Sequence, residues 1–99
     1  MKLPKVGDYF LLHNDSGPPL RIVTVFTRQR EIMVKARDKR GRIMAMQLYR
    51  TLFWGSKEQC DKVRAARVEF HRLHLASYMT LHNNYNFVLD QMRKERNDG

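Results

Sequence analysis

Cysteine is nearly absent from this chain, which has Cys60 as its only thiol in 99 residues. A single cysteine excludes an intramolecular disulfide, and it excludes a zinc site built from several cysteines of one chain. A fold that needs no disulfide is compatible with a reducing compartment. We therefore expect a cytoplasmic protein.

Long apolar runs and glycine-rich motifs are also missing. No uninterrupted apolar run approaches the roughly 20 residues that a membrane helix requires, and so we expect no membrane-spanning segment. The 5 glycines are isolated from one another, and none belongs to a Gly-x-Gly-x-x-Gly sequence or a phosphate loop. We therefore expect no nucleotide cofactor, and no other cofactor is indicated.

Catalytic and metal-binding patterns are equally sparse. His71 and His74 are close enough in sequence to share a metal ion on a helix, but a closed zinc site needs about four ligands and the chain offers no matching set. Cys60 could pair with either histidine as nucleophile and base, yet its position three residues before Val63 favours packing in a core. We expect no metal, no catalytic residue and no enzymatic activity.

Acidic residues are scarce relative to basic ones. The chain has 10 Asp and Glu against 19 Lys and Arg, which gives a formal net charge of +9 and an isoelectric point near 10.2. Residues 21–50 hold nine of the basic side chains and only two acidic ones. A concentrated excess of this kind favours polyanions or acidic protein surfaces as partners.

The first half of the chain has the pattern of a β-sheet. Short apolar runs rich in β-branched and aromatic residues predict four strands. These are Asp8–His13, Leu20–Arg28, Arg30–Arg37 and Arg42–Arg50. Asp38-Lys39-Arg40-Gly41 separates the last two runs and places a glycine where a hairpin loop needs one, which makes those strands antiparallel neighbours.

The second half has helical spacing. Ser56 and Gln59 form a capping-box pattern, which predicts a helix beginning at Lys57. One apolar stripe follows at steps of three and four residues: Val63, Ala66, Phe70, Leu73, Ser77 and Leu81. His82–Asn86 is rich in residues that prefer caps and turns, so either the helix stops there and a shorter one spans Phe87–Arg96, or it continues without a break.

Together these patterns predict one α+β domain over residues 1–99. Residues 1–55 are expected to form a small antiparallel sheet or SH3-like barrel of about four to five short strands. Residues 56–96 form one long or two shorter helices, and residues 97–99 a frayed tail. The order of Val6-Gly7-Asp8, a proline-containing loop, the strands, the charged hairpin and Leu52-Phe53-Trp54 resembles small SH3-like barrels such as KOW and Tudor-type modules. The resemblance implies binding of nucleic acid or peptides, and it assigns no functional residue.

The candidate binding residues fall into a basic and an aromatic group. The basic group comprises Arg28, Arg30, Lys35, Arg37, Lys39, Arg40, Arg42, Arg64 and Arg67. Its last two members lie on the predicted helix, where they share a face with His71 and His74 and either extend an anion-binding surface or form a solvated face. The aromatic group comprises Tyr49, Phe53 and Trp54. It either stacks on bases or anchors a protein partner, or it fills the end of the core between strand and helix.

Two functions fit these features. The first is a small non-enzymatic basic protein that contacts DNA or RNA, mainly through phosphates, with its Arg/Lys-rich hairpin surface. The second is a protein-interaction module, an inhibitor or adaptor, that binds an acidic surface of a host protein. Compact basic proteins of this kind are frequent among phage and mobile-element products. Val68, Leu75 and Met79 lie off the apolar stripe and offer a homodimer contact through the helix.

Overall fold

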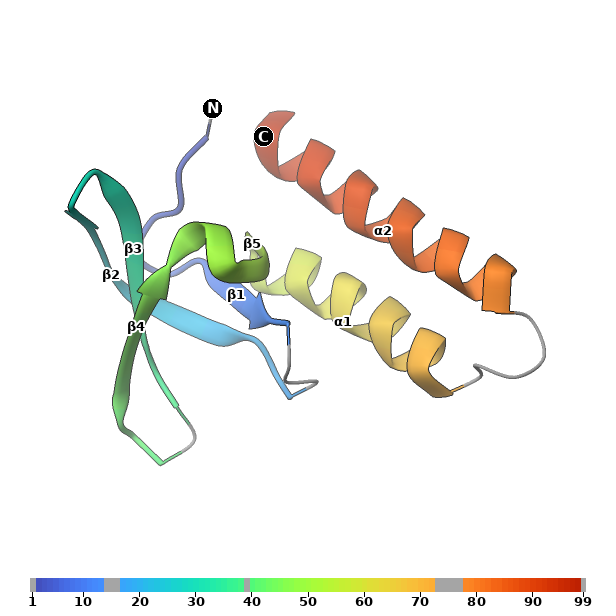
Figure 1. The fold of residues 1–99 in the computed structure, drawn as a ribbon, viewed down its shortest axis with the longest axis horizontal. Helices are drawn as coiled ribbons and strands as arrows, with labels where there is room; N and C mark the ends of the chain where they lie inside the picture. Colours follow the sequence, from blue (N-terminus) through green and yellow to red (C-terminus); the bar gives the residue numbers. More distant parts are fainter. Residues whose placement is uncertain (1, 14–16, 39, 73–77, 99) are drawn as a thin grey trace.

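The computed structural model describes residues 2–13, 17–38, 40–72 and 78–98. It has the expected α+β arrangement, a five-stranded antiparallel sheet followed by two helices (Figure 1). The strands are β1 (Tyr9–Leu12), β2 (Leu20–Arg28), β3 (Glu31–Arg37), β4 (Ile43–Gln47) and β5 (Thr51–Gly55). The helices are η1 (Leu48–Arg50, a 3-10 turn), α1 (Lys57–Arg72) and α2 (Tyr78–Asp98).

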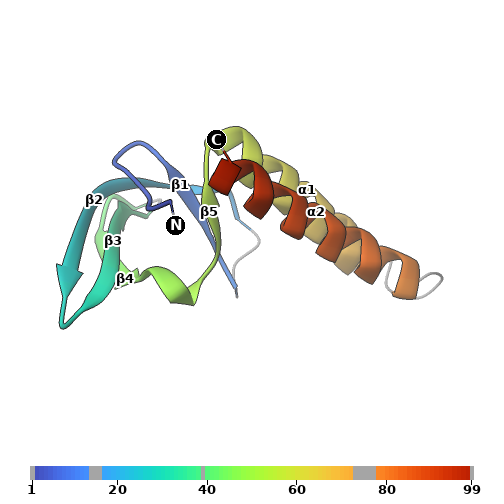
Figure 2. The ribbon, with the colours of Figure 1, turned by 90° about the horizontal axis from the view of Figure 1, so that it is seen from above.

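The strand order across the sheet is β4-β3-β2-β1-β5. The charged hairpin forms as expected, because β3 and β4 pair antiparallel with Val34 opposite Met46 and Ala36 opposite Met44. The sheet is curled, and the two helices lie beside β1 and β5 (Figure 2). In the described part of the chain β4 and β5 are opposite edges with no ladder between them, so the sheet is open and not a closed barrel.

The fourth predicted strand was too long. It ends at Gln47, and the chain then turns through η1 before β5 begins. Thr51 stabilises this turn because its hydroxyl and its backbone N–H both donate to the carbonyl of Leu48, the hydroxyl at 2.7 Å. The turn moves the chain from one edge of the sheet to the other.

The segment expected between strand and helix is itself a strand. In β5, Trp54 lies opposite Phe10 of β1, and Phe53 lies opposite Leu11. All five residues of β5 are buried. A strand covered on both faces has no alternation of apolar and polar residues, and Leu52-Phe53-Trp54 shows none.

Two apolar clusters lie on either side of β1 and β5. Between these strands and the helices, Leu11, Leu52 and Phe53 pack with residues of α1 and α2. Inside the curl of the sheet, Phe10 and Trp54 pack with residues of β2 and β3. The helical members of the first cluster are Cys60, Val63, Leu89 and Met92, and the strand members of the second are Ile22, Val34 and Ala36. Adjacent residues of β1 and β5 thus contribute to different clusters.

Helix α1 begins as the capping box predicts. The backbone N–H of Gln59 donates to the Ser56 hydroxyl, and the backbone N–H of Ser56 donates to the Gln59 side chain, both at 3.1 Å. The two rings of Phe70 and Tyr85 stack with their centroids 5.7 Å apart and link α1 to α2. The helix therefore starts where the sequence predicts, whereas the expected apolar stripe is divided: Leu73 and Ser77 lie outside the described residues and Leu81 belongs to α2.

One of the two expected alternatives was a helix break at His82–Asn86, and the structure has no break there. Helix α2 passes through His82–Asn86 without interruption and extends to Asp98, beyond the expected boundary at Arg96. α1 ends at Arg72 and α2 begins at Tyr78, and residues 73–77 lie outside the described part. Tyr85, Leu89 and Met92 pack against the first cluster at helical spacing, and this contact outweighs the weak helix propensity of the asparagines.

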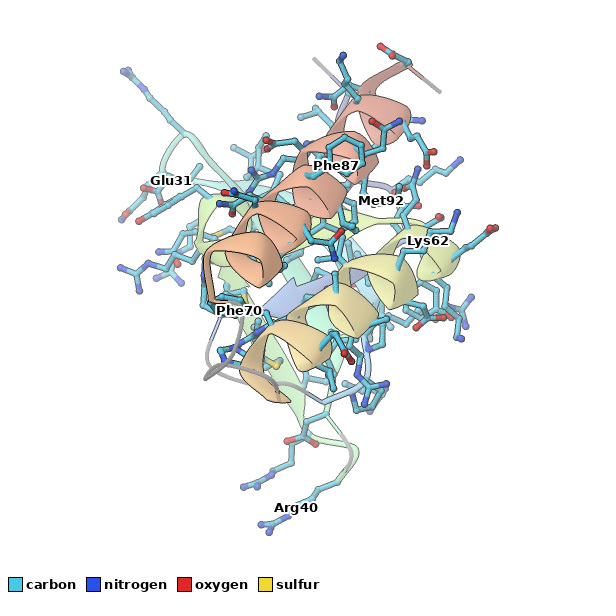
Figure 3. The ribbon with its side chains drawn as sticks, turned by 90° about the vertical axis from the view of Figure 1, so that its right-hand side faces the viewer. Glu31, Arg40, Lys62, Phe70, Phe87 and Met92 are labelled. Atoms are coloured by element: carbon cyan, nitrogen blue, oxygen red, sulfur yellow. The ribbon has the colours of Figure 1, made fainter. Side chains whose placement is uncertain are left out.

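The off-stripe apolar residues are only partly described. Val68 is exposed on α1, Leu75 lies outside the described residues, and so does the side chain of Met79. Phe87 is also exposed, on the side of α2 that faces away from the sheet (Figure 3). The described residues therefore leave some apolar surface uncovered on the helical pair.

Arginine side chains bind carbonyl groups of the two strands that border the helices. Arg67 is 8% exposed and donates to the carbonyls of Leu12 and His13, where β1 ends. Arg96 donates to the carbonyl of Trp54 at 3.0 Å, and Arg93 donates to that of Leu52 at 3.4 Å. Carbonyls two residues apart point to the same side of a strand, so Arg93 and Arg96 satisfy the free edge of β5.

We expect Arg67→Ala to lower the free energy of unfolding by about 2 kcal/mol, because it leaves two carbonyls without their donor and opens a space beneath α1. Lys62→Ala on the same helix is the control, since it removes only an exposed ion pair with Glu58 that contributes at most about 0.5 kcal/mol. Urea unfolding of both variants measures the difference. Equal, small losses would contradict the structural role of Arg67.

Candidate anion-binding surface

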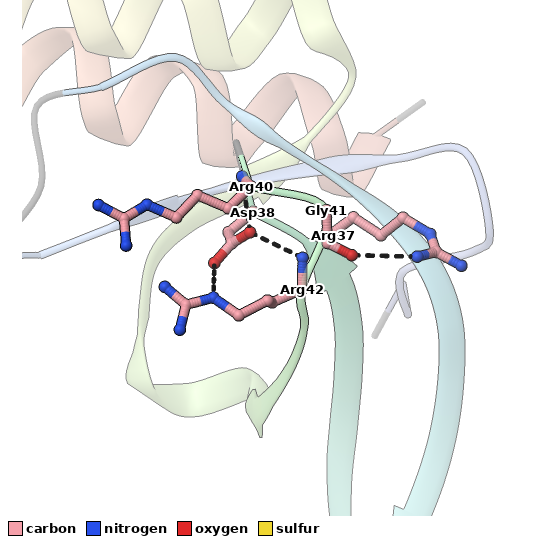
Figure 4. Close-up of polar contacts among 5 residues, drawn as sticks. All are labelled: Arg37, Asp38, Arg40, Gly41 and Arg42. Carbon is pink, nitrogen blue, oxygen red and sulfur yellow. Dashed lines mark hydrogen bonds and ion pairs between the residues drawn. The ribbon is translucent and has the colours of Figure 1, made fainter.

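The β3–β4 loop is built around Asp38. Its carboxylate accepts the backbone N–H groups of Arg40 and Arg42, each at 2.9 Å, and lies 3.6 Å from the Arg42 Nε (Figure 4). The Gly41 N–H donates to the Asp38 carbonyl at 3.0 Å, and Gly41 has φ +80°. Glycine adopts this left-handed conformation without a steric penalty. The loop is therefore ordered by its own hydrogen bonds.

Three guanidinium groups are exposed around this single carboxylate. Arg40 and Arg42 extend to one side of the loop and Arg37 to the other, where its Nη1 donates to the Gly41 carbonyl at 3.1 Å (Figure 4). Among the described residues the Arg40 guanidinium has no hydrogen-bond or ion-pair partner. Lys39, the remaining basic candidate of this loop, lies outside the described residues. The described residues of the loop thus carry cations that face outward from a hydrogen-bonded turn.

A second cationic turn joins β2 to β3. Arg28 lies opposite Glu31 in the β2–β3 ladder, which leaves Gln29 and Arg30 as a two-residue loop. Their φ angles are +51° and +68°, the left-handed values of a type I′ turn, and neither residue is glycine. Arg28 and Arg30 are both exposed on this turn. Left-handed backbone at such residues is unfavourable, and it is frequent where a side chain has a functional task.

The basic residues of the sheet do not form one patch. The two turns lie at opposite ends of β3, about 20 Å apart by strand length, and Glu31 and Arg40 mark these ends in Figure 3. Lys35 lies between them with its ammonium 5.2 Å from the centre of the Phe26 ring. The charge excess of residues 21–50 is therefore divided between two loops.

The predicted basic strip on the helix is interrupted. Arg67 is buried beneath α1, so its charge is used within the fold and is not part of an accessible surface. Arg64 is half-buried, His71 is exposed, and His74 lies outside the described residues. Arg64, Arg67 and His71 lie on α1 as expected, but Arg67 faces the end of β1 and not the solvent.

The three aromatic candidates lie in different environments. Phe53 is 1% exposed and Trp54 is 7% exposed, each within one of the two core clusters. Tyr49, on η1, is 67% exposed, and the Arg50 guanidinium lies 5.8 Å from its ring centre. Of the three, Tyr49 is the one whose ring can be reached from solvent.

Arg93 and Arg96 are site residues that the sequence did not single out. Together with Arg30 and Tyr49 they line a cavity of about 460 Å³ between η1, β5, the start of β3 and α2. The Arg96 guanidinium lies 4.1 Å from the ring centre of Trp54 and 5.4 Å from that of Phe53. Burial lowers the pKa of Arg96, and the nearby charge of Arg93 lowers it further. The cavity forms because α2 contacts β5, which lies about 40 residues earlier in the sequence. The spacing of neighbouring residues in the sequence therefore cannot predict it.

Neither the thiol of Cys60 nor the metal-ligand side chains of the described residues form a reactive centre. Burial, assisted by the charge of Asp61, raises the pKa of Cys60 to about 12. The thiol is therefore protonated at neutral pH and is not an activated nucleophile. The described residues contain no group of three or more His, Cys, Asp or Glu that could hold a metal ion.

Within the described ranges, neither α1 nor α2 has the length and apolarity that crossing a membrane requires. Comparisons with protein-family models, curated proteins and solved structures find no match to this chain. The surface itself is therefore the basis for a functional proposal.

We expect the double variant Gln29→Asn/Arg30→Gly to be more stable than the natural chain by about 1 kcal/mol, because Asn-Gly adopts a type I′ turn with little strain. Urea unfolding measures the change. The single variant Arg30→Ala is the control, since it removes the same charge and keeps a residue with a Cβ at the left-handed position. A double variant no more stable than Arg30→Ala would contradict the geometry of the turn.

Proposed function

We propose that the protein binds nucleic acid through its β3–β4 loop, mainly by contacts to phosphates. The observation that carries this proposal is the loop built around Asp38, which holds Arg37, Arg40 and Arg42 exposed against one carboxylate. Guanidinium groups match the oxygens of a phosphate in two-pronged hydrogen bonds. Because Asp38 holds the backbone of Arg40 and Arg42 by hydrogen bonds, binding through these residues costs less conformational entropy than it would for a flexible basic tail.

The charge of the rest of the molecule supports the same reading. The net charge of +9 attracts a polyanion over a distance, while phosphate contacts position the protein and carry little sequence information. The Arg28–Arg30 turn, at the other end of β3, lies within reach of the same strand of nucleic acid. We therefore propose a non-enzymatic binding protein with modest sequence preference.

A protein-interaction module remains the second candidate, with an acidic surface of another protein as its target. The net charge of +9 favours an acidic target, and the exposed Val68 and Phe87 on the helical pair are apolar side chains of the kind that serve as anchors at interfaces. Self-association through this pair is a separate, third candidate. Sedimentation of the natural chain and of Phe87→Ala distinguishes a dimer from a monomer that recruits another protein.

The test of the proposed function replaces Arg37, Arg40 and Arg42 with glutamate. The control replaces Lys2, Arg21 and Lys94 with glutamate, three exposed residues on other parts of the molecule, so that both variants lower the net charge equally. Anisotropy titrations with labelled duplex DNA at several salt concentrations measure affinity and its salt dependence. We expect the loop variant to bind much more weakly than the natural chain, and the slope of log affinity against log salt to become shallower by roughly 2.7 for three lost phosphate contacts.

The control variant should keep most of the natural slope. Equal weakening of both variants would contradict a specific role of the loop and would leave only general electrostatic attraction. Absence of binding by the natural chain to DNA and RNA would overturn the proposal and favour the protein-partner candidate.

A further inference from the structure

The cavity between η1, β5 and α2 combines an apolar wall with cationic side chains. Its apolar lining includes Ile32, Leu48 and Leu52, and its cations are Arg30, Arg93 and Arg96. Its volume of about 460 Å³ lies within the range of about 300–1,000 Å³ that is usual for small-ligand sites. The cavity is thus of a suitable size for one small ligand.

The charges around the cavity favour an anion. Glu31 is the one carboxylate among its lining residues, against three guanidinium groups. Arg96 has no carboxylate within 4 Å among the described residues, and its hydrogen bonds go to the Trp54 carbonyl and the Asn97 side chain. Arg93 forms an exposed ion pair with Asp90, with Nη1 and Oδ1 3.6 Å apart, and an anionic ligand can displace the Asp90 carboxylate from it. A guanidinium that is partly buried without a counterion gains from binding an anion.

The aromatic ring of Tyr49 favours a second property of the ligand, a flat ring. Tyr49 lines the cavity, is mostly exposed, and belongs to the rigid turn that Thr51 stabilises. An exposed ring held in place beside cations is a surface on which a flat ring can stack. The ligand that satisfies both requirements has a flat ring and a phosphate.

We propose that this cavity binds one unpaired nucleotide, with its base stacked on Tyr49 and its phosphate held by Arg96 and Arg93. The inference rests on the proposed function and narrows it, because a base within a duplex is paired and cannot enter the cavity. Nucleic acid would then be held at two places, by phosphates at the β3–β4 loop and by an unstacked nucleotide near η1. Single strands are accordingly the preferred form.

Trp54 provides a direct readout, since it is the only tryptophan and lines the cavity. We expect a short oligothymidylate to change the Trp54 emission and to bind more tightly than a duplex of equal length. Tyr49→Ala should weaken binding of the single strand about tenfold and that of the duplex little. Arg93→Gln, which removes the charge of one phosphate-binding side chain, should act in the same direction.

The matched controls are Phe87→Ala, an exposed aromatic residue on the outer side of α2, and Lys94→Gln, the neighbour of Arg93 outside the cavity. Both should bind the single strand as the natural chain does. Thymidine monophosphate and inorganic phosphate are titrated in parallel. Tighter binding of the oligonucleotide identifies a strand as the ligand, and equal affinity for the monophosphate identifies a free nucleotide.

The outcomes separate this inference from the proposed function. Single strands could bind in the anisotropy titration while the Trp54 emission stays unchanged and Tyr49→Ala binds as tightly as Phe87→Ala. This result would overturn the cavity as a nucleotide site and would leave the loop as the binding surface. A change of emission with inorganic phosphate as large as that with the nucleotide would overturn the role of the base. Absence of binding to every nucleic acid would overturn both.

Discussion

The burial of β5 on both of its faces is the constraint on which the other features of this structure depend. All five residues from Thr51 to Gly55 are buried, with Phe53 packed toward the helices and Trp54 packed inside the curl of the sheet. Because β5 is an edge strand, its outer carbonyls need donors, and the end of α2 supplies them through Arg93 and Arg96. The same contact forms one wall of the cavity, so the packing of the fold and the candidate site have a common origin.

Local patterns were sufficient where neighbouring residues decide the structure. The capping box at Ser56 fixed the start of α1, and the glycine of the charged loop identified the β3–β4 hairpin. Local patterns did not predict the structure where contacts between residues distant in the sequence determine it. His82–Asn86 has the composition of a helix end, yet Tyr85 and Leu89 hold it in α2 through contacts with the sheet and α1. β5 lacked the alternation of a strand because two layers cover it.

The candidate site illustrates the same limit. The sequence showed that residues 21–50 carry most of the net positive charge, but the length of β3 separates the basic residues of its two loops from one another. Arg67 and Arg40 are the same residue type, and one is buried against β1 while the other is exposed at a loop. Arg93 and Arg96 lie far from β5 in the sequence, so only the tertiary contact reveals that they and Tyr49 line one cavity. Charge counts identify a class of partner, and the fold determines which charges can reach it.

The most direct measurement of the central claim, that two separate surfaces of this small fold engage one nucleic acid strand, is an NMR titration of the ¹⁵N-labelled protein with a short single strand. We expect the amide shifts to concentrate in two groups, the loop around Asp38 and the residues of η1 and α2 that line the cavity. The exposed helical face around Val68 and Phe87 should stay unchanged. Shifts confined to that helical face, or spread evenly over the molecule, would contradict the account.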